Sequence, residues 1–158
     1  LRTFFHFETR KGDGELLTKI LGRTSTPILA VPARPKPLKK VLIAYDGSPA
    51  SARAVRDFTL LAQPFDMETD LFLSDNNRAQ LDFHANKLNY YLNDHEIPVS
   101  RVIRYSDVPI AAIEEGLTKD YDLIVCGMHS RSPLHEFFVG SFARRLIEQQ
   151  ENALYLSH

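Results

Sequence analysis

The sequence predicts an α/β fold in which a parallel sheet carries helices on both faces. Short, continuous apolar runs such as residues 41–45 indicate strands that are buried on both faces. Between these runs, apolar residues recur at helical spacing. Strands that alternate with helices along a chain form parallel sheets with right-handed crossovers, so the alternation predicts a doubly wound sheet.

The first half of this domain begins with the strand at residues 41–45. Ser48 and Pro49 then start a helix, because proline suits the first helical position. The second strand is expected at residues 68–74. The long helix after it carries an apolar stripe of Leu81, Ala85, Leu88 and Leu92.

The second half repeats the alternation and ends on a fifth strand. The third strand is expected at residues 101–105. The third helix is expected to run from Asp107 and Pro109 through a stripe of Ile110, Ile113 and Leu117. The closing elements are a strand at residues 122–126, a helix at residues 139–149 and a strand at residues 153–156.

Length and composition are those of an ordinary globular domain. The chain has 158 residues, enough for one domain with a real core, and 44% apolar residues exclude a disordered protein. Lys and Arg number 19 against 20 Asp and Glu, so the charge does not indicate a nucleic-acid or membrane surface. No apolar run approaches the roughly 20 residues that a membrane span needs.

The single cysteine, Cys126, lies inside a predicted strand and cannot form a disulfide within the chain. A reducing cytoplasm is therefore the expected location. A buried, inert thiol is favoured over a reactive one, because cysteine in an apolar strand behaves as a small apolar residue.

Residues 127–141 connect the strand at residues 122–126 to the closing helix. Small residues in such a loop let backbone N–H groups turn toward a ligand. The first N–H groups of a helix have no partner within the helix and carry partial positive charge. A strand, a loop of this kind and a helix N-terminus can together hold an anion, and phosphate is the commonest one.

This loop resembles that of the universal stress protein family. The family carries Gly, two residues, Gly, nine residues, Gly and then Ser or Thr. Gly127, Gly140 and Ser141 match this pattern, and Ser130 stands at the second glycine. Two further segments match in the family's order. Residues 40–48 end, like its first strand, in an aspartate followed by Gly-Ser, and residues 122–127 look like its fourth strand.

The resemblance covers residues 38–158 and implies a Rossmann-like, adenine nucleotide alpha hydrolase-like sheet of five strands in the order 3-2-1-4-5. The crevice between the first and fourth strands is then the place where ligands of open α/β sheets bind. An adenine nucleotide is implied as ligand, so ATP is the expected cofactor. The residues implied to contact it are Ala44, Asp46, Gly127, Ser130, Arg131, Gly140, Ser141 and Phe142.

Several of these residues also have a purely structural interpretation. Asp46 either accepts a hydrogen bond from a ribose or base, as the resemblance implies, or caps the helix that follows. Gly127 and Gly140 either let the backbone approach phosphate or serve tight turns and helix–strand packing. Ser141 either bonds a phosphate oxygen or caps its helix.

Ser130 is the main departure from the family pattern. If its backbone needs a positive φ, serine costs ~1–2 kcal/mol there. Its hydroxyl can itself donate to a phosphate, and the neighbouring Arg131 is cationic. A loss of ~1.4 kcal/mol is tenfold in affinity, so Ser130 is expected to weaken ATP binding without removing it.

Enzyme chemistry has little support in the sequence, which has no phosphate-loop, nucleophile-elbow or zinc-protease motif. His129 and His135 lack Cys, Asp or Glu partners at ligand spacing, so no metal site is predicted. Three functions stay open. The first is a stress-response module that binds ATP and at most hydrolyses it slowly. The second is a nucleotide-free interaction module, and the third, with least support, is a small-molecule enzyme that uses the same crevice.

Residues 1–37 lie outside this domain. Their segments 14–21 and 26–31 match the closing helix and strand at a constant offset of 126 residues, which sets Ile28 against Leu154. The match predicts the tail of a preceding copy in a tandem protein, of which the chain is a fragment. Residues 32–37 are then a stiff, proline-rich linker. The alternative is an ordinary N-terminal helix and strand.

The fifth strand, at residues 153–156, is apolar and lies at the edge of the expected sheet. A bare apolar edge promotes aggregation, so another strand should cover it. We predict that residues 27–31 pair antiparallel with this strand, within one chain or between two. The family commonly dimerises along its fifth strand, so the resemblance implies a homodimer or a tandem pseudo-dimer.

Overall fold

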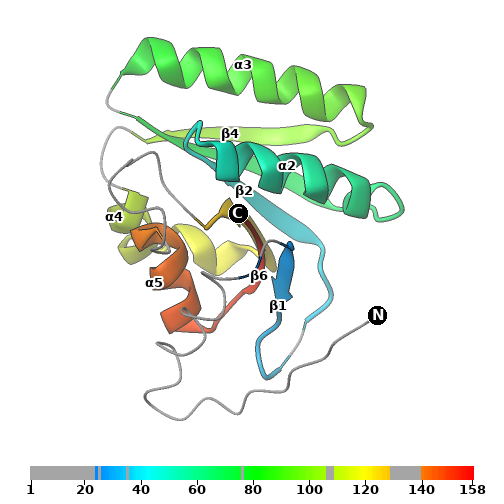
Figure 1. The fold of residues 1–158 in the computed structure, drawn as a ribbon, viewed down its shortest axis with the longest axis vertical. Helices are drawn as coiled ribbons and strands as arrows, with labels where there is room; N and C mark the ends of the chain where they lie inside the picture. The colour runs from blue at the N-terminus through cyan, green and yellow to red at the C-terminus, as the bar shows by residue number, and fades with distance from the viewer. Residues whose placement is uncertain (1–23, 25, 35, 76, 106–108, 129–139) are drawn as a thin grey trace.

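The computed structural model describes residues 24, 26–34, 36–75, 77–105, 109–128 and 140–158, which form a six-stranded sheet with helices on both faces (Figure 1). The strands are β1 (Ile28–Ala30), β2 (Lys40–Tyr45), β3 (Glu68–Ser74), β4 (Val99–Tyr105), β5 (Leu123–Gly127) and β6 (Ala153–Ser157). The helices are α2 (Pro49–Ala62), α3 (Arg78–Asp94), α4 (Pro109–Glu114) and α5 (Ser141–Gln149), with a 3-10 helix, η1, at Leu117–Asp120. Within these ranges, no helix is long and apolar enough to cross a membrane.

The five parallel strands confirm the predicted order. Across the sheet they run β4, β3, β2, β5 and β6, which is the order 3-2-1-4-5 of the prediction. β1 lies beside β6 as a sixth strand, in addition to the five predicted for residues 38–158. This strand is antiparallel to β6, so the sheet is mostly rather than wholly parallel.

β1 covers the edge of β6, which confirms the predicted antiparallel pairing and places it within one chain. Residues Ile28, Leu29 and Ala30 pair with Leu156, Tyr155 and Leu154, respectively. Ile28 and Ala30 pack against the apolar core beside β6, whereas Leu29 is 45% exposed. The apolar edge that the sequence predicted is therefore covered by a short strand from the same chain.

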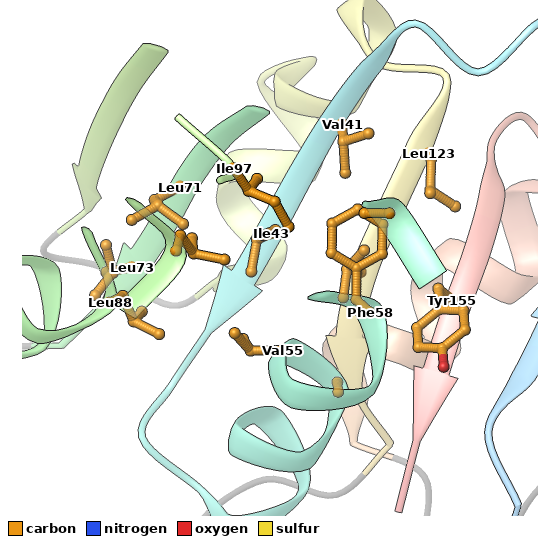
Figure 2. Packing of buried hydrophobic residues seen from close by; sticks show 14 of the residues in the cluster. Val41, Ile43, Val55, Phe58, Leu71, Leu73, Leu88, Ile97, Leu123 and Tyr155 are labelled. Atoms are coloured by element: carbon orange, nitrogen blue, oxygen red, sulfur yellow. The ribbon is translucent and has the colours of Figure 1, made fainter. Parts of the chain in front are cut away.

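Two apolar layers hold the helices to the sheet, one on each face. Successive residues of β2 point to opposite faces, so Val41 and Ile43 join one layer while Leu42 joins the other. Figure 2 shows the first layer, where Phe58 of α2 packs near Ile43 and Tyr155. The second layer lies under α4 and α5. Burial on both faces explains why β2 and β5 are continuous apolar runs.

The third helix is shorter than predicted. α4 ends at Glu114, and Leu117 belongs to the separate helix η1. Gly116 lies between them with a φ of 92°, a left-handed conformation that ends an α-helix. The apolar stripe continues across this break because Ile113 and Leu117 pack into the same layer.

An ionic network around the buried Asp70 joins β3, β4 and Tyr121, which lies two residues before β5. Asp70 is 1% exposed, and its Oδ2 accepts hydrogen bonds from the Tyr121 hydroxyl at 2.6 Å and from Arg101 Nε at 3.2 Å. Arg101 also donates to the Tyr121 hydroxyl at 2.8 Å. Burial and the bond to Asp70 raise the pKa of Tyr121 to about 12, so this hydroxyl keeps its proton at neutral pH.

Candidate functional site

A cavity of about 280 Å³ opens at the carboxyl ends of the parallel strands. β2 has β3 as its neighbour on one side and β5 on the other, and the chain continues from β2 to β3. The cavity therefore lies at the switch point of the sheet, where the strand order reverses. It is lined by six of the eight residues that the sequence predicts as ligand contacts: Ala44, Asp46, Gly127, Gly140, Ser141 and Phe142. The other two, Ser130 and Arg131, lie outside the described residues, as do His129 and His135.

Part of the cavity wall was not predicted from the sequence. Phe72 and Ser74 come from the end of β3, Pro109 begins α4, and Ser51 lies in the first turn of α2. Phe72 and Ser74 could have been predicted as cavity residues because they lie at the end of a predicted strand. Neighbouring parallel strands end at the same edge of a sheet. Neither Pro109 nor Ser51 carries such a signal, since their places depend on how the helices pack.

Asp46 follows β2 directly and borders the cavity. Its Oδ1 accepts a hydrogen bond from the backbone N–H of Ser48 at 2.9 Å, across Gly47, whose φ is 75°. The N-cap of α2 is Ser48 itself, whose hydroxyl accepts from the N–H of Ser51 at 3.1 Å. The interpretation of Asp46 as the helix cap is therefore wrong. Its carboxylate instead holds the turn that precedes the helix.

Gly127 marks a close approach between β5 and the start of α2. A Cβ atom at this position would lie 2.5 Å from the backbone nitrogen of Ser51 and 2.8 Å from the carbonyl carbon of Ala50. Backbone atoms cannot rotate away from such a contact, and packed interiors have little room to yield. Helix–strand packing, one of the two interpretations of this glycine, therefore requires glycine here.

The N-terminus of α5 faces the cavity. Gly140 is its N-cap residue, and no side chain of the described residues caps it. The first bond of the helix runs from the N–H of Arg144 to the carbonyl of Gly140 at 2.9 Å. The N–H groups of residues 141–143 therefore have no acceptor within the helix, and all three residues line the cavity. This helix end has the partial positive charge that favours an anion.

Two details of this loop differ from expectation. Ser141 is the first residue of α5 and not its cap, so its interpretation as a capping residue is wrong. The backbone N–H of Gly140 donates to the carbonyl of Met128, which uses one N–H group of the loop within the protein. An anion at this site would therefore meet the N–H groups of α5 itself.

Cys126 lies in the cavity wall and is 2% exposed. Burial, and to a lesser degree the negative charge of Asp46, raise the pKa of its thiol to about 12. The thiol is therefore protonated at neutral pH, which agrees with the inert cysteine that the sequence predicted. Among the described residues, no group of His, Cys, Asp and Glu side chains could hold a metal ion.

The Cys126 thiol should resist alkylation in the folded protein. The thiolate is the reactive form, and with a pKa of about 12 only about one thiol in ten thousand is ionised at pH 8. Mass spectrometry after treatment with iodoacetamide at pH 8 should show unmodified protein, and one adduct once denaturant is added. Rapid labelling of the native protein would contradict the burial described here.

Comparison with known proteins adds the family context. The sequence profile of the universal stress protein family matches residues 37–153. No curated protein gives a significant match. The solved structure of universal stress protein UspA from Lactobacillus plantarum has a TM-score of 0.65 at 16% identity, over 77% of this chain and 98% of its own.

Two other solved structures extend the comparison. A universal stress protein in complex with cAMP has a TM-score of 0.61 at 18% identity, over 77% of this chain and 97% of its own. A universal stress protein from Archaeoglobus fulgidus has a TM-score of 0.66 at 17% identity, over 94% of this chain and 57% of its own. At these identities the structural likeness shows the fold alone.

Proposed function

The chain belongs to the universal stress protein family, and we propose that it is a stress-response module that binds an adenine nucleotide, ATP, in the cavity between Asp46 and α5. One observation carries the proposal: a carboxylate and the N-terminus of α5 border the same cavity at the switch point of the sheet. The solved relative in complex with cAMP supports a nucleotide as the class of ligand.

Two parts of the cavity wall suit different parts of a nucleotide. The N–H groups of residues 141–143 favour phosphate oxygens, helped by the dipole of α5. The carboxylate of Asp46 accepts hydrogen bonds from ribose hydroxyls or from an amino group of the base. In this arrangement Gly140 and Ser141 lie beside the phosphates. The proposal includes no catalytic residue and at most slow hydrolysis of ATP.

Calorimetric titration of the full chain with ATP tests this assignment. The wild-type protein should bind, and Gly140→Leu should weaken binding by more than tenfold because its side chain would occupy the phosphate end of the cavity. The fold should tolerate this change, since Gly140 has a φ of −56° that any residue can adopt. Ser130→Gly, which restores the family pattern, should tighten binding about tenfold.

Ala79→Leu is the matched control, because it adds the same side chain at an exposed position in the first turn of α3. This control should bind ATP like the wild type. Equal affinities of the wild type and Gly140→Leu would contradict the placement of phosphate at α5. Ser130→Gly binding that is unchanged or weaker would contradict the role given to Ser130.

A nucleotide-free interaction module is the second candidate function. It is favoured by the bond from the Gly140 N–H to the carbonyl of Met128, which removes one donor from a phosphate site. Ser130, in place of the family's second glycine, also favours this second function. The calorimetric titration separates the two functions, because a nucleotide-free module gives no saturable heat with ATP.

We also propose that residues 1–37 are the closing part of a preceding copy, joined to a complete domain at residues 38–158. By the offset of 126 residues, Ile28, Leu29 and Ala30 correspond to Leu154, Tyr155 and Leu156, and they pair with Leu156, Tyr155 and Leu154. The register is therefore symmetric about the Leu29–Tyr155 pair. Equivalent strands of two copies related by a two-fold axis pair in this way, so a tandem pseudo-dimer is the assembly we propose.

A further inference from the structure

Three aromatic side chains from β4, β3 and α5 contact one another in a row beside the cavity. The ring of Phe72 lies 6.0 Å from that of Tyr105 and 5.9 Å from that of Phe142, between centroids. The rings of Phe72 and Phe142 are nearly parallel, with 12° between their planes. The hydroxyl of Tyr105 donates to Glu115 Oε1 at 2.9 Å, which holds its end of the row.

Phe142 differs from the other apolar residues of α5. Ala143, Leu146 and Ile147 are at most 3% exposed and belong to the core, whereas Phe142 is only half-buried and lines the cavity. Phe72 also lines the cavity but is 2% exposed. Of the two rings, Phe142 therefore has the larger accessible surface, while Phe72 supports it from β3.

We propose that Phe142, supported by Phe72, holds the planar base of the nucleotide, so that Phe142 selects ligands with a base over base-free sugar phosphates. This inference rests on the proposed function and deepens it. Aromatic rings bind nucleobases by stacking, because every base has a π-face. Phe142 directly follows Ser141, so the first turn of α5 presents an anion-binding backbone and an aromatic ring to the same cavity.

The nearby wall suits a base as well. Ala44 and Pro109 add apolar surface to the same cavity. Asp46 lines the same cavity, and its carboxylate can accept hydrogen bonds from sugar hydroxyls. A nucleoside monophosphate therefore meets a distinct kind of group at each of its three parts: aromatic for the base, carboxylate for the ribose and backbone N–H for the phosphate.

Two ligands that differ only in the base test this inference on the full chain. The probes are AMP and ribose 5-phosphate, measured by calorimetry and by displacement. Phe142→Leu should weaken AMP binding about tenfold, as expected for the loss of one base–aromatic stack, and should change ribose 5-phosphate binding less than about twofold. Phe142→Tyr should bind AMP like the wild type, because it keeps the ring. Phe65→Leu, at a 61% exposed position outside the cavity, is the control and should leave both affinities unchanged.

The outcomes separate this inference from the proposed function. Equal weakening of both ligands by Phe142→Leu, or tighter AMP binding, overturns the role of Phe142 while nucleotide binding stands. Wild-type protein that binds neither ATP nor AMP overturns both. If Phe142→Leu lowers the thermal midpoint, nuclear Overhauser effects between the adenine protons and the Phe142 ring in the wild type decide the matter: their presence supports the inference and their absence overturns it.

Discussion

Replacing Gly127 with alanine is expected to lower the free energy of unfolding by about 1–3 kcal/mol, the usual cost of forcing an extra methyl group into a packed interior. The added Cβ would lie 2.5 Å from the backbone nitrogen of Ser51. β5 cannot move away easily, because it pairs with β2 on one side and β6 on the other. Denaturant unfolding followed by circular dichroism measures the change.

Gly140→Ala is the matched control for this prediction, since it makes the same substitution at the other end of the loop. Gly140 is an N-cap residue with a φ of −56°, so alanine meets no backbone strain there and costs about 1 kcal/mol or less as a poorer cap than glycine. Combining Gly127→Ala with Ala50→Gly should not restore stability, because the backbone contacts remain. Equal stability of the Gly127→Ala and Gly140→Ala variants would contradict the packing role of Gly127.

Replacing Arg101 with methionine is expected to destabilise the fold by about 3 kcal/mol, the low end of the range for breaking a buried ion pair. Asp70 is 1% exposed, and its Oδ1 has no hydrogen-bond partner among the described residues. Loss of the guanidinium therefore leaves a buried carboxylate whose remaining donor, among the described side chains, is the Tyr121 hydroxyl. We use the low end of this energy range because the Arg101 side chain is 57% exposed. Water therefore partly solvates the Arg101–Asp70 ion pair.

A second substitution checks the cause. Adding Asp70→Asn to Arg101→Met removes the buried charge and keeps an oxygen that can accept from Tyr121, so the double variant should be more stable than Arg101→Met alone. Arg104→Met is the surface control. Arg104 pairs with Asp82 at 2.8 Å where the carboxylate side chain is 50% exposed, and its loss should cost less than about 1 kcal/mol. Equal costs for Arg101→Met and Arg104→Met would refute the buried network.

The central strands of this fold could be predicted from the sequence because burial on both faces leaves a simple pattern. The runs at residues 41–45 and 68–74 lie within β2 and β3. The third helix could not be bounded correctly, since Ile113 and Leu117 serve the same apolar layer on both sides of the Gly116 break. The spacing of apolar residues shows which of them share an apolar layer. A left-handed glycine can end a helix without changing that spacing.

The site was partly predictable for a similar reason. Asp46 and Gly127 could be placed together because parallel strands end at the same edge of a sheet. The Asp70–Tyr121 hydrogen bond joins residues 51 positions apart and depends on side-chain packing that no local pattern records. The stacked pair of Phe72 and Phe142 was missed likewise, since it depends on how α5 lies against β3.

Nuclear magnetic resonance titration of the full chain with ATP tests the central proposal most directly. Backbone amide signals of residues 141–143, Gly127 and Asp46 should shift together and saturate, because these groups border the proposed ligand. Signals of Asp70 and Tyr121, which lie outside the cavity, should stay in place. Two results would contradict nucleotide binding at the N-terminus of α5. In the first, ATP shifts and saturates other signals while those of residues 141–143 stay unchanged. In the second, ATP shifts no signal at all.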